Sequence, residues 1–418
     1  MAKFKDSGIP WIGMIPKDWE VKRLKEVFVE CKEKSLDGAG ELLSLSQYKG
    51  VQLKKDTDKA GTHESETNEG YNVVHKGQLV MNIMLAWNGS YAISDYDGII
   101  SPAYCVFDFR TDCVKRYFHY LLRTNGYPSA FKTLSRGIID SRLRLYPEQF
   151  YTFPTILPPL PTQQRIADFL DRKCAEIVEL AALQETMIEE LKRYKQSLIT
   201  ETVTGKWKIE NGKGKTGKWK VENGKLKDSG VEWIGEIPEG WEVRKIKTMA
   251  TLKSGNNLTT NDFLEGEDGY PVYGGNGFRG YYSQYSNDGD FVLIGRQGAL
   301  CGNINYAHGK FWATDHAVVC YPKCEFFLTW FGESLRAMNL NQYSLSSAQP
   351  GLSVDRIREL YMVVPPLSEQ QQIADFLDRK CAEIDELIAV KQQKIEALKE
   401  YKKSVIFEYV TGKKEVME

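Results

Sequence analysis

The stretch IADFLDRKCAEI occupies residues 166–177 and occurs again, without one change, at residues 373–384. A second pair of similar motifs opens each half of the chain, KDSGIPWIGMIPKDWEV from Lys5 and KDSGVEWIGEIPEGWEV from Lys227. Each half then contains a mixed segment, a Pro-Pro-Leu hinge and a long helical pattern that ends in Val-Thr-Gly-Lys. Self-similarity on this scale has to be explained before any single motif. It indicates one frame that is built twice.

The two copies of the frame enclose different interiors. The opening motifs and helical patterns are nearly copied, whereas the mixed segments between them differ strongly. A tandem duplication without functional meaning is the simpler alternative, but neutral drift would spread over the frame as well as the interiors. The pattern therefore favours two domains that share one framework and have different contact surfaces.

Apolar residues recur at three- and four-residue steps after each hinge, which is the pattern of a coiled-coil seam. Each run covers about 40 residues, or roughly 60 Å at 1.5 Å per residue. Such a seam is longer than one small domain needs, so we expect the two helices to pack on each other in antiparallel orientation. The alternative is that each helix covers only its own domain. The residues expected in helix packing and partner contacts are Ile177, Leu180, Leu191, Tyr194 and Leu198 in the first helix and Ile384, Leu387, Leu398 and Tyr401 in the second.

The repeats divide the 418 residues into five parts, and a chain of this length can hold more than one domain with its own core. The expected parts are a first globular domain at residues 1–157, a first helix at 158–204, a linker at 205–226, a second globular domain at 227–364, and a second helix with a C-terminal tail at 365–418. The fold class that follows is mixed α/β, with two globular domains separated by two long antiparallel coiled-coil helices. The sequences at the two ends of the chain resemble the sequence that joins its two halves, which indicates a pseudo-two-fold, circular arrangement.

The composition is that of a globular protein, with 42% hydrophobic and 27% charged residues. No apolar run is long enough to span a bilayer, and the N-terminus lacks the apolar core of a signal peptide, so we expect a cytoplasmic protein without a membrane partner. Lys plus Arg (55) nearly balance Asp plus Glu (56). Any positive charge that binds nucleic acid must therefore be local.

The eight cysteines are scattered and form no paired CxxC knuckles. Cys320 and Cys324 come nearest to a ligand pair, but no second pair with metal spacing follows. We expect free, reduced and mostly buried thiols and no metal site.

The linker contains a tandem 12-residue duplication, TGKWKIENGKGK followed at once by TGKWKVENGKLK. Its glycines and excess lysine predict a mobile tether that neither holds a helix nor builds a core. A Gly-Lys-Thr triplet occurs within it, but a P-loop also needs a glycine where Ile209 stands. Nucleotide binding is therefore not expected.

Taken together, the motifs resemble the specificity subunit of type I restriction-modification systems over essentially the whole chain. The residues that carry the resemblance are IPWIGMIPKDWEV and VEWIGEIPEGWEV, PPLPTQQRIADFLDRK and PPLSEQQQIADFLDRK, and the closing Val-Thr-Gly-Lys. In that family two target recognition domains each read one half of a split, asymmetric DNA target. The helices hold the domains apart and dock modification subunits.

The resemblance also implies partners and cofactors. It implies double-stranded DNA, two modification (methyltransferase) subunits, and motor-nuclease subunits bound through the complex. Catalysis would then reside in those partners, with S-adenosylmethionine in the modification subunits and ATP with magnesium in the motor-nuclease. The chain itself is expected to be a non-catalytic subunit that holds no cofactor.

Candidate DNA contacts in the second domain lie where glycines, aromatic residues and hydrogen-bonding side chains interleave, in YPVYGGNGFRGYY and FVLIGRQGALCGNINY. Arg and Gln can each make paired hydrogen bonds to base edges, and glycine lets the backbone approach phosphate. The candidates in these stretches are Asn276, Arg279, Tyr281, Arg296 and Gln297, and the later stretch FWATDH adds His316. The alternative is that these glycines are simple turns beside a core strand.

In the first domain the parallel segment is HKGQLVMNIMLAWNGSY. Its buried strand leaves Asn82, Trp87 and Asn88 as candidates for DNA contact. Arg142 and Arg144 flank the stretch that leads back to the hinge and are candidates for phosphate contacts. Solvated surface charge is the commoner role of such arginines.

Two other classes of function remain as alternatives. One is a self-contained nuclease or methyltransferase, but no Asn-Pro-Pro-Tyr or Asp-Pro-Pro-Tyr signature and no nuclease carboxylate cluster is present. The other is a coiled-coil scaffold that binds proteins only. A scaffold has no reason to keep two frames and vary their contents, so the sequence favours the DNA-reading subunit.

Overall fold

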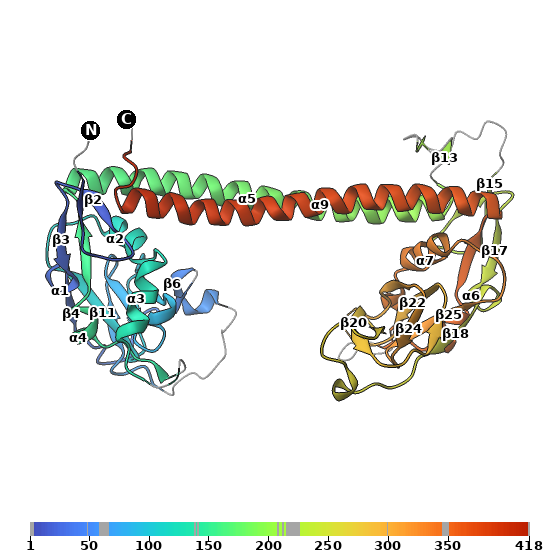
Figure 1. The fold of residues 1–418 in the computed structure, drawn as a ribbon, viewed down its shortest axis with the longest axis horizontal. Coiled ribbons are helices and arrows are strands. Elements are labelled where there is room, and N and C mark those ends of the chain that lie inside the picture. The colour runs from blue at the N-terminus through green and yellow to red at the C-terminus, as the bar shows by residue number, and fades with distance from the viewer. Residues whose placement is uncertain are drawn as a thin grey trace. The chain divides into compact units, whose positions relative to one another are not determined.

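The computed structural model describes residues 4–47, 49–57, 67–137, 139, 142–206, 209–210, 213–214, 226–298, 300–344 and 351–416. The chain forms two compact units (Figure 1). Unit 1 is assembled from Met1–Leu183 and Gln393–Glu418, and unit 2 is Gln184–Gln392. Each unit therefore combines one α/β domain with one end of each long helix.

Unit 1 opens with short strands and closes on the first long helix. Its elements are β1 (Phe4–Asp6), β2 (Met14–Pro16), β3 (Glu20–Arg23), α1 (Leu24–Val27), β4 (Phe28–Cys31), β5 (Leu43–Ser46), β6 (Gly50–Leu53), η1 (Lys54–Asp56), β7 (Asn72–Val74), β8 (Leu79–Asn82), η2 (Ala86–Asn88), β9 (Tyr91–Ile93), β10 (Gly98–Ile100), β11 (Tyr104–Phe109), α2 (Lys115–Leu122), α3 (Gly126–Leu134), α4 (Pro147–Phe150), β12 (Pro154–Leu157) and the start of α5 (Leu160–Val203).

Unit 2 follows the same order with a different interior. Its elements are the end of α5, the short pair β13 (Ile209–Glu210) and β14 (Lys213–Gly214), β15 (Leu226–Asp228), β16 (Glu236–Pro238), β17 (Glu242–Lys245), α6 (Ile246–Met249), β18 (Ala250–Ser254), η4 (Thr260–Asp262), β19 (Tyr270–Gly274), β20 (Gly277–Tyr282), β21 (Asn287–Asp288), β22 (Phe291–Gly295), β23 (Ile304–Ala307), β24 (Lys310–Ala313), β25 (Ala317–Pro322), α7 (Leu328–Ala337), η5 (Leu340–Tyr343), α8 (Val354–Arg358), β26 (Tyr361–Val364) and the start of α9 (Leu367–Val410).

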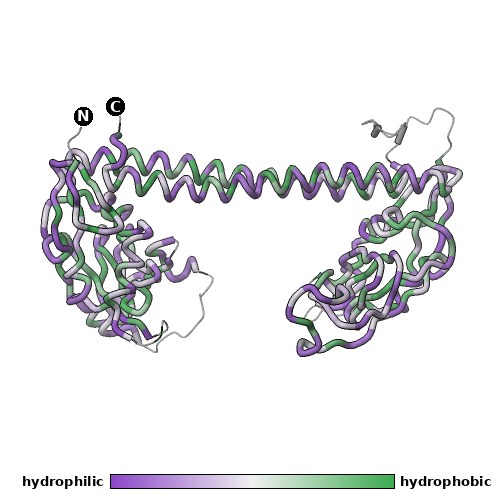
Figure 2. The backbone as a smooth tube through the Cα atoms, viewed as in Figure 1, coloured by the Kyte–Doolittle hydropathy of each residue, from purple (hydrophilic) through white to green (hydrophobic). Residues whose placement is uncertain are grey.

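The centre of unit 1 is a four-stranded antiparallel sheet in the order β4-β11-β8-β9. Every residue of β8 is buried, because its side chains alternate between two cores. Leu79 and Met81 face a large core that includes Tyr117 and Phe131 from the helices, while Val80 faces a smaller core. Figure 2 shows how the apolar segments gather inside the domain.

Unit 2 repeats this sheet as β18-β25-β22-β23. Val292 and Ile294 face the large core with the helices, and Leu293 faces a smaller one. The layer over that smaller core differs between the units. In unit 2 it is the four-stranded sheet β20-β19-β24-β21, whereas unit 1 has the two-stranded pairs β5-β6 and β10-β7. The repeated frame thus carries two different outer layers, as the repeats predicted.

The ends of the long helices are held by glycine against the opening motifs. Gly205 and Gly412 follow α5 and α9 with φ of +76° and +69°, a left-handed conformation that favours glycine after a helix. A Cβ atom would lie 2.7 Å from Pro238 at Gly205 and 2.5 Å from Pro16 at Gly412. The Val-Thr-Gly-Lys motif therefore both ends each helix and allows a close approach of the opening motif.

α5 and α9 pack in antiparallel orientation within each unit. In unit 1 the Phe169 and Tyr409 rings lie 4.3 Å apart, and in unit 2 Lys195 Nζ lies 2.6 Å from an Asp385 carboxylate oxygen. Residue numbers therefore increase along α5 in the direction in which they decrease along α9, as in an antiparallel pair. The buried positions of α5 advance in steps of three and four residues, as a coiled-coil seam does.

The packed seam differs in part from the one expected. Of the expected residues, Ile177, Leu198 and Ile384 are buried, and Leu191 and Leu398 are partly buried. Leu180, Tyr194, Leu387 and Tyr401 lie outside the seam, with 47%, 51%, 50% and 50% of their surface exposed. Cys174, Gln184, Ile188 and Lys195 occupy the buried or partly buried steps of α5 instead. The helix has two neighbouring apolar stripes, and the buried stripe is the more polar of the two. Hydrophobicity along the sequence therefore could not predict which stripe is buried.

Most of the 12-residue duplication lies outside the described residues, so its role as a tether stays a prediction. Within the described ranges, no helix has the length and apolar character needed to cross a membrane.

Candidate nucleic-acid interface

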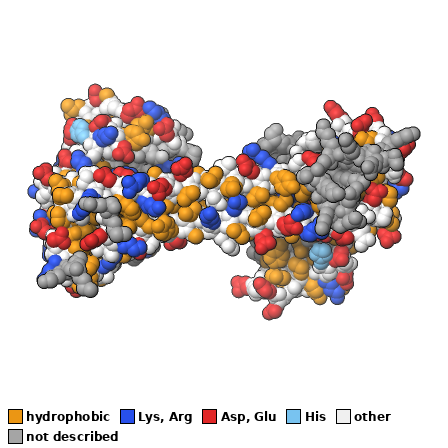
Figure 3. All heavy atoms as spheres, turned by 90° about the horizontal axis from the view of Figure 1, so that it is seen from above, with side chains coloured by type: hydrophobic (Ala, Val, Ile, Leu, Met, Phe, Trp, Pro, Cys, Tyr) orange, Lys and Arg blue, Asp and Glu red, His pale blue; other side chains and the backbone are white. Residues whose placement is uncertain are grey.

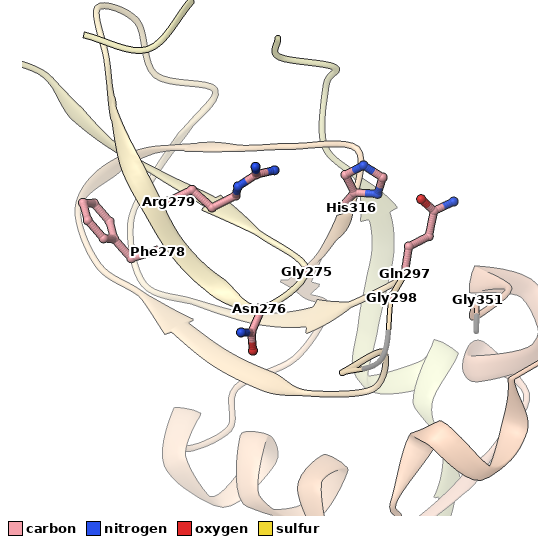
Figure 4. Close-up of a pocket in the computed structure, with 8 residues that line it drawn as sticks. All are labelled: Gly275, Asn276, Phe278, Arg279, Gln297, Gly298, His316 and Gly351. Carbon is pink, nitrogen blue, oxygen red and sulfur yellow. The ribbon is translucent and has the colours of Figure 1, made fainter. Parts of the chain in front are cut away.

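An open cavity of about 600 Å³ lies in unit 2 beside the outer sheet (Figure 4). Three turns build it: the β19–β20 hairpin, the segment after β22, and the β24–β25 turn. The residues that line it are Gly275, Asn276, Phe278, Arg279, Gln297, Gly298, His316 and Gly351. Four of the six candidates for DNA contact in this domain therefore come together.

The hairpin reaches the cavity because its turn is short. Gly274 pairs with Gly277, which leaves Gly275 and Asn276 as a two-residue turn. A Cβ atom on Gly295, at the end of β22, would lie 2.0 Å from the carbonyl oxygen of Gly275. The glycine of the Ile-Gly-Arg-Gln stretch thus lets the hairpin turn lie directly against the end of the central strand.

Three hydrogen-bonding side chains converge in the cavity. In Figure 4 the Arg279 guanidinium points toward His316, and Gln297 lies next to His316, while Asn276 and Phe278 point away from this group. Among the described residues, no protein group forms a hydrogen bond with the side chain of Arg279 or Gln297. Arg279 lies over the Phe263 ring, with 5.8 Å between the guanidinium carbon and the ring centroid.

Arg296 does not line this cavity, and its hydrogen bonds lie within the protein around it. Its Nη1 donates to Ser254 Oγ at 3.1 Å, and its backbone N–H donates to the His316 carbonyl at 2.8 Å. Its carbonyl oxygen accepts a hydrogen bond from the Leu352 N–H at 2.9 Å. Arg296 thereby joins three segments of the chain. Tyr281, the remaining candidate, is a partly buried residue of β20 that packs edge-on against Phe278.

Asn276 and Phe278 shape the outer edge. The Asn276 side-chain oxygen accepts a hydrogen bond from the Asn303 amide at 3.2 Å. Phe278 is 54% exposed, which is unusual for a phenylalanine on a strand, and sequence reasoning did not single it out. The sequence signal was the hairpin itself, where Phe278 and Arg279 come one residue after the turn.

The candidates of unit 1 are not grouped in this way. Asn82 is buried, and its side-chain oxygen accepts a hydrogen bond from the Met84 N–H at 2.9 Å. Trp87 donates to the Met84 carbonyl at 3.0 Å, and the Lys132 ammonium lies 5.2 Å from its ring centroid. Asn88 accepts a hydrogen bond from Ser90 at 2.8 Å. Both asparagines therefore stabilise the turn after β8.

The two arginines of unit 1 belong to a separate short bridge. Arg144 pairs with Arg136 through backbone hydrogen bonds of 2.9 Å, and Arg142 is exposed in the segment between them. The two cavities of unit 1 that contain Trp11 include none of the five candidates. Contact of these five residues with DNA stays a prediction.

All eight cysteines are free thiols, of which three are buried, four are partly buried and one is exposed. Burial raises the pKa of Cys105 and Cys113 to about 12 and that of Cys381 to about 11. Cys320 is buried in the central sheet, whereas Cys324 is exposed. No group of three or more His, Cys, Asp or Glu side chains that could hold a metal ion occurs within the described part of the chain.

Known proteins share this architecture. A solved structure from work on complex assembly and conformational transition of the type I R-M system aligns with 95% of this chain and 98% of its own, with a TM-score of 0.70 and 15% identity. The HsdS subunit from Thermoanaerobacter tengcongensis covers the same shares, with a TM-score of 0.54 and 14% identity. At such identities the likeness concerns the fold.

Sequence relatives agree with it. The EcoprrI specificity subunit of Escherichia coli is 44% identical over 141 residues, which are 32% of this chain and only 35% of that relative. The MjaVIII specificity subunit of Methanocaldococcus jannaschii is 23% identical, over 96% of this chain and 93% of its own length.

The family described as Type I restriction modification DNA specificity domain matches the chain twice, over residues 16–193 and 238–399. Each match begins near an opening motif and ends within a long helix, so the family pattern follows the two copies of the frame. The chain belongs to the family of type I restriction-modification DNA-specificity proteins.

Proposed function

We propose that this chain is the specificity subunit of a type I restriction-modification complex and reads a bipartite, asymmetric DNA target. The observation that carries the proposal is the unit 2 cavity, where Arg279, Gln297 and His316 converge without using the side-chain donors of Arg279 and Gln297 inside the described protein. The frame that presents them occurs twice, with a different outer layer in each unit. Two recognition domains that share a framework and differ in their outer layers suit a DNA target with two different half-sites.

The cavity chemistry fits base edges better than phosphate alone. A guanidinium can donate two hydrogen bonds to the O6 and N7 atoms of guanine, and a glutamine amide can pair with the N6 and N7 atoms of adenine. Phe278 offers an apolar surface of the kind that contacts a thymine methyl group. The half-site read by unit 2 is therefore expected to contain purines within reach of Arg279 and Gln297.

Modification subunits would dock on the exposed apolar stripe of the helices. Figure 3 shows hydrophobic side chains at the surface along the helical part of the molecule. Equivalent positions of the repeat place Leu180, Leu183 and Tyr401 in unit 1 and Leu387, Val390 and Tyr194 in unit 2, each about half exposed. One such set per unit supports two copies of the modification subunit, since exposed apolar patches mark protein contacts.

Catalysis in this proposal belongs to the partners. S-adenosylmethionine would bind the modification subunits, and ATP with magnesium would bind the motor-nuclease subunits, while this chain supplies DNA sequence selection. Because this chain would select sequences in chromosomal DNA, its proposed location is the cytoplasm.

The test is to map methylated sites in cells that carry this chain together with its modification subunits. We expect one bipartite sequence with a fixed spacer, and no methylation when this chain is omitted. Methylation of a single continuous site, or methylation and cleavage by the purified chain alone, would contradict the proposal.

A further inference from the structure

A buried glutamine stands in the first turn of each long helix. Gln163 and Gln370 occupy equivalent positions of the repeated hinge motif and are only 1% and 2% exposed. Polar side chains this deeply buried are retained when they hydrogen-bond to other buried groups. Sequence reasoning singled out neither residue.

In unit 1 the Gln163 amide joins three segments. Its Nε2 donates to the carbonyl oxygen of Pro158 in the hinge at 2.7 Å, and its Oε1 accepts from the backbone N–H of Val114 at 2.9 Å. Val114 immediately precedes α2, which packs in the domain core. The end of β12, the start of α5 and the start of α2 are thus tied to one side chain.

Unit 2 repeats the same arrangement. Gln370 Nε2 donates to the Pro365 carbonyl at 2.9 Å, and its Oε1 accepts from the Phe327 N–H at 3.2 Å. Phe327 is the residue before α7, the counterpart of α2. An amide suits this position because it offers a donor and an acceptor at once, which a carboxylate does not.

A second contact follows eight residues later along each helix, about 12 Å away at 1.5 Å per residue. Asp171 accepts hydrogen bonds from Arg116 Nε and the Tyr120 hydroxyl, both at 2.6 Å, and Asp378 accepts one from the Thr329 hydroxyl at 3.1 Å. The helix also packs against the domain core through apolar side chains, but apolar packing is not directional, whereas hydrogen bonds at two points along a helix favour one angle. The glutamine is the buried point of each pair and the aspartate the more exposed one.

We propose that Gln163 and Gln370 are positioning residues that set the angle of each recognition domain on its long helix, and thereby the spacer length that the complex accepts. The inference rests on the proposed reading of a bipartite target. α5 and α9 are continuous helices through residues of both units, so an angular change at either hinge alters where a reading surface meets DNA.

DNA geometry makes spacer choice a sensitive measure of this angle. Each added base pair moves a half-site by about 3.4 Å and turns it by about 34° around the duplex. A recognition domain that is held rigidly can match only one spacer. A domain that swings at its hinge can follow a half-site displaced by one base pair.

The experiment uses the full chain assembled with its modification subunits. The wild-type target and spacer are mapped first. Methylation is then compared on duplexes that carry the native spacer and spacers one base pair shorter or longer. The ratio of these rates does not depend on the fraction of active complex, so a variant that is merely less stable leaves it unchanged.

The variants are Gln163→Met and Gln370→Met, which keep the length of the side chain and remove both hydrogen bonds. Their matched controls are Gln164→Met and Gln371→Met, at exposed neighbouring positions. Should Gln163→Met not fold, Val114→Pro removes the donor of the same hydrogen bond, and the φ of −82° at Val114 is close to the proline range.

We expect the preference for the native spacer to fall roughly tenfold in each glutamine variant, equivalent to about 1.4 kcal/mol. Half-site sequences should stay the same, and the controls should match wild type. An unchanged ratio, or an equal loss of methylation on all spacers, would overturn the positioning role. A wild type without a bipartite target would instead remove the proposed function, and the inference with it.

Discussion

Arg279 projects from β20 into the cavity of unit 2, where no described protein group hydrogen-bonds to its guanidinium. If it reads a base edge, Arg279→Ala should cost about 1 to 3 kcal/mol of binding and relax one position of the target. Dissociation constants for a duplex with the native target measure the first effect, and methylation mapping measures the second. Arg358→Ala is the control, because Arg358 is exposed on α8 and pairs with Asp355 at 3.5 Å. Uniform weakening over all sequences would assign Arg279 to phosphate.

Substitutions at Gly205 and Gly230 distinguish the backbone strain of a non-glycine residue from the steric overlap of its Cβ atom. Both have left-handed φ, +76° and +68°, but a Cβ atom at Gly205 would lie 2.7 Å from Pro238, whereas Gly230 has nothing within 4 Å. Gly230→Ala should lower the free energy of unfolding by about 1 kcal/mol through backbone strain alone. Gly205→Ala should cost more, because the opening motif must also move. Thermal unfolding measures the two variants, and equal losses would show that the close approach does not matter.

His119 makes the stability of unit 1 depend on pH. Its Nδ1 is buried without a hydrogen-bond partner among the described residues, and burial, with the charges of Arg116 and Arg123, lowers the pKa of His119 from 6.5 to about 3. Between these values the unfolded chain binds a proton that the folded chain does not. This contribution to stability is therefore complete above pH 6.5 and falls as the pH falls, by about 2 kcal/mol at pH 5.

Denaturant unfolding at pH 7.5 and pH 5 measures this effect. His119→Gln should lose less stability on acidification than wild type does. His308→Gln should behave as wild type, because His308 is exposed and pairs with Asp290 at 3.0 Å. The same acid sensitivity in His119→Gln and wild type would exclude His119 as its source.

The long helices carry two apolar stripes with different roles, and one substitution in each distinguishes them. Leu198 is 2% exposed in the packed seam, so Leu198→Asp buries a charge and should cost about 3 to 5 kcal/mol. Tyr194 is 51% exposed, so Tyr194→Asp should leave folding intact and weaken binding of the modification subunit. Thermal unfolding and co-purification measure the two outcomes. A Tyr194→Asp variant that assembles normally would argue against docking on this stripe.

The helices also show where periodicity stops being informative. Three- and four-residue steps predicted a seam, and Ile177, Leu198 and Ile384 lie in it. Leu180 and Tyr194 fit the same spacing but face outward. Both stripes have the period of a coiled coil, and the choice between them depends on the partner helix and on the domain each end must meet.

At the scale of the molecule, the structure defines what can be exchanged as one piece. β3 pairs with β12 so that Glu20 lies opposite Leu157, and β17 pairs with β26 so that Glu242 lies opposite Val364. Each recognition domain thus begins and ends on two strands of one antiparallel pair. Replacing residues 20–157 with the matching segment of a relative should change one half-site and leave the other.

Methylation mapping of the exchanged chain checks this modularity. A replacement of residues 242–364 should change the other half-site, which makes the two exchanges controls for each other. A change of both half-sites after one exchange would mean that the domains do not read DNA independently.

The sequence by itself determined the duplicated frame, the two long helices and the family, because these features are written as local repeats and as hydrophobic periodicity. It also pointed to Arg279, Gln297 and His316, since glycine turns next to hydrogen-bonding side chains can be read locally. Only the tertiary structure decided that these three residues meet in one cavity, and that Asn82 is buried beneath a turn. The same holds for Gln163, whose hydrogen-bond partner Val114 lies 49 positions away. Contacts between distant segments depend on how the strands pair and the layers pack, and no local pattern in the sequence records them.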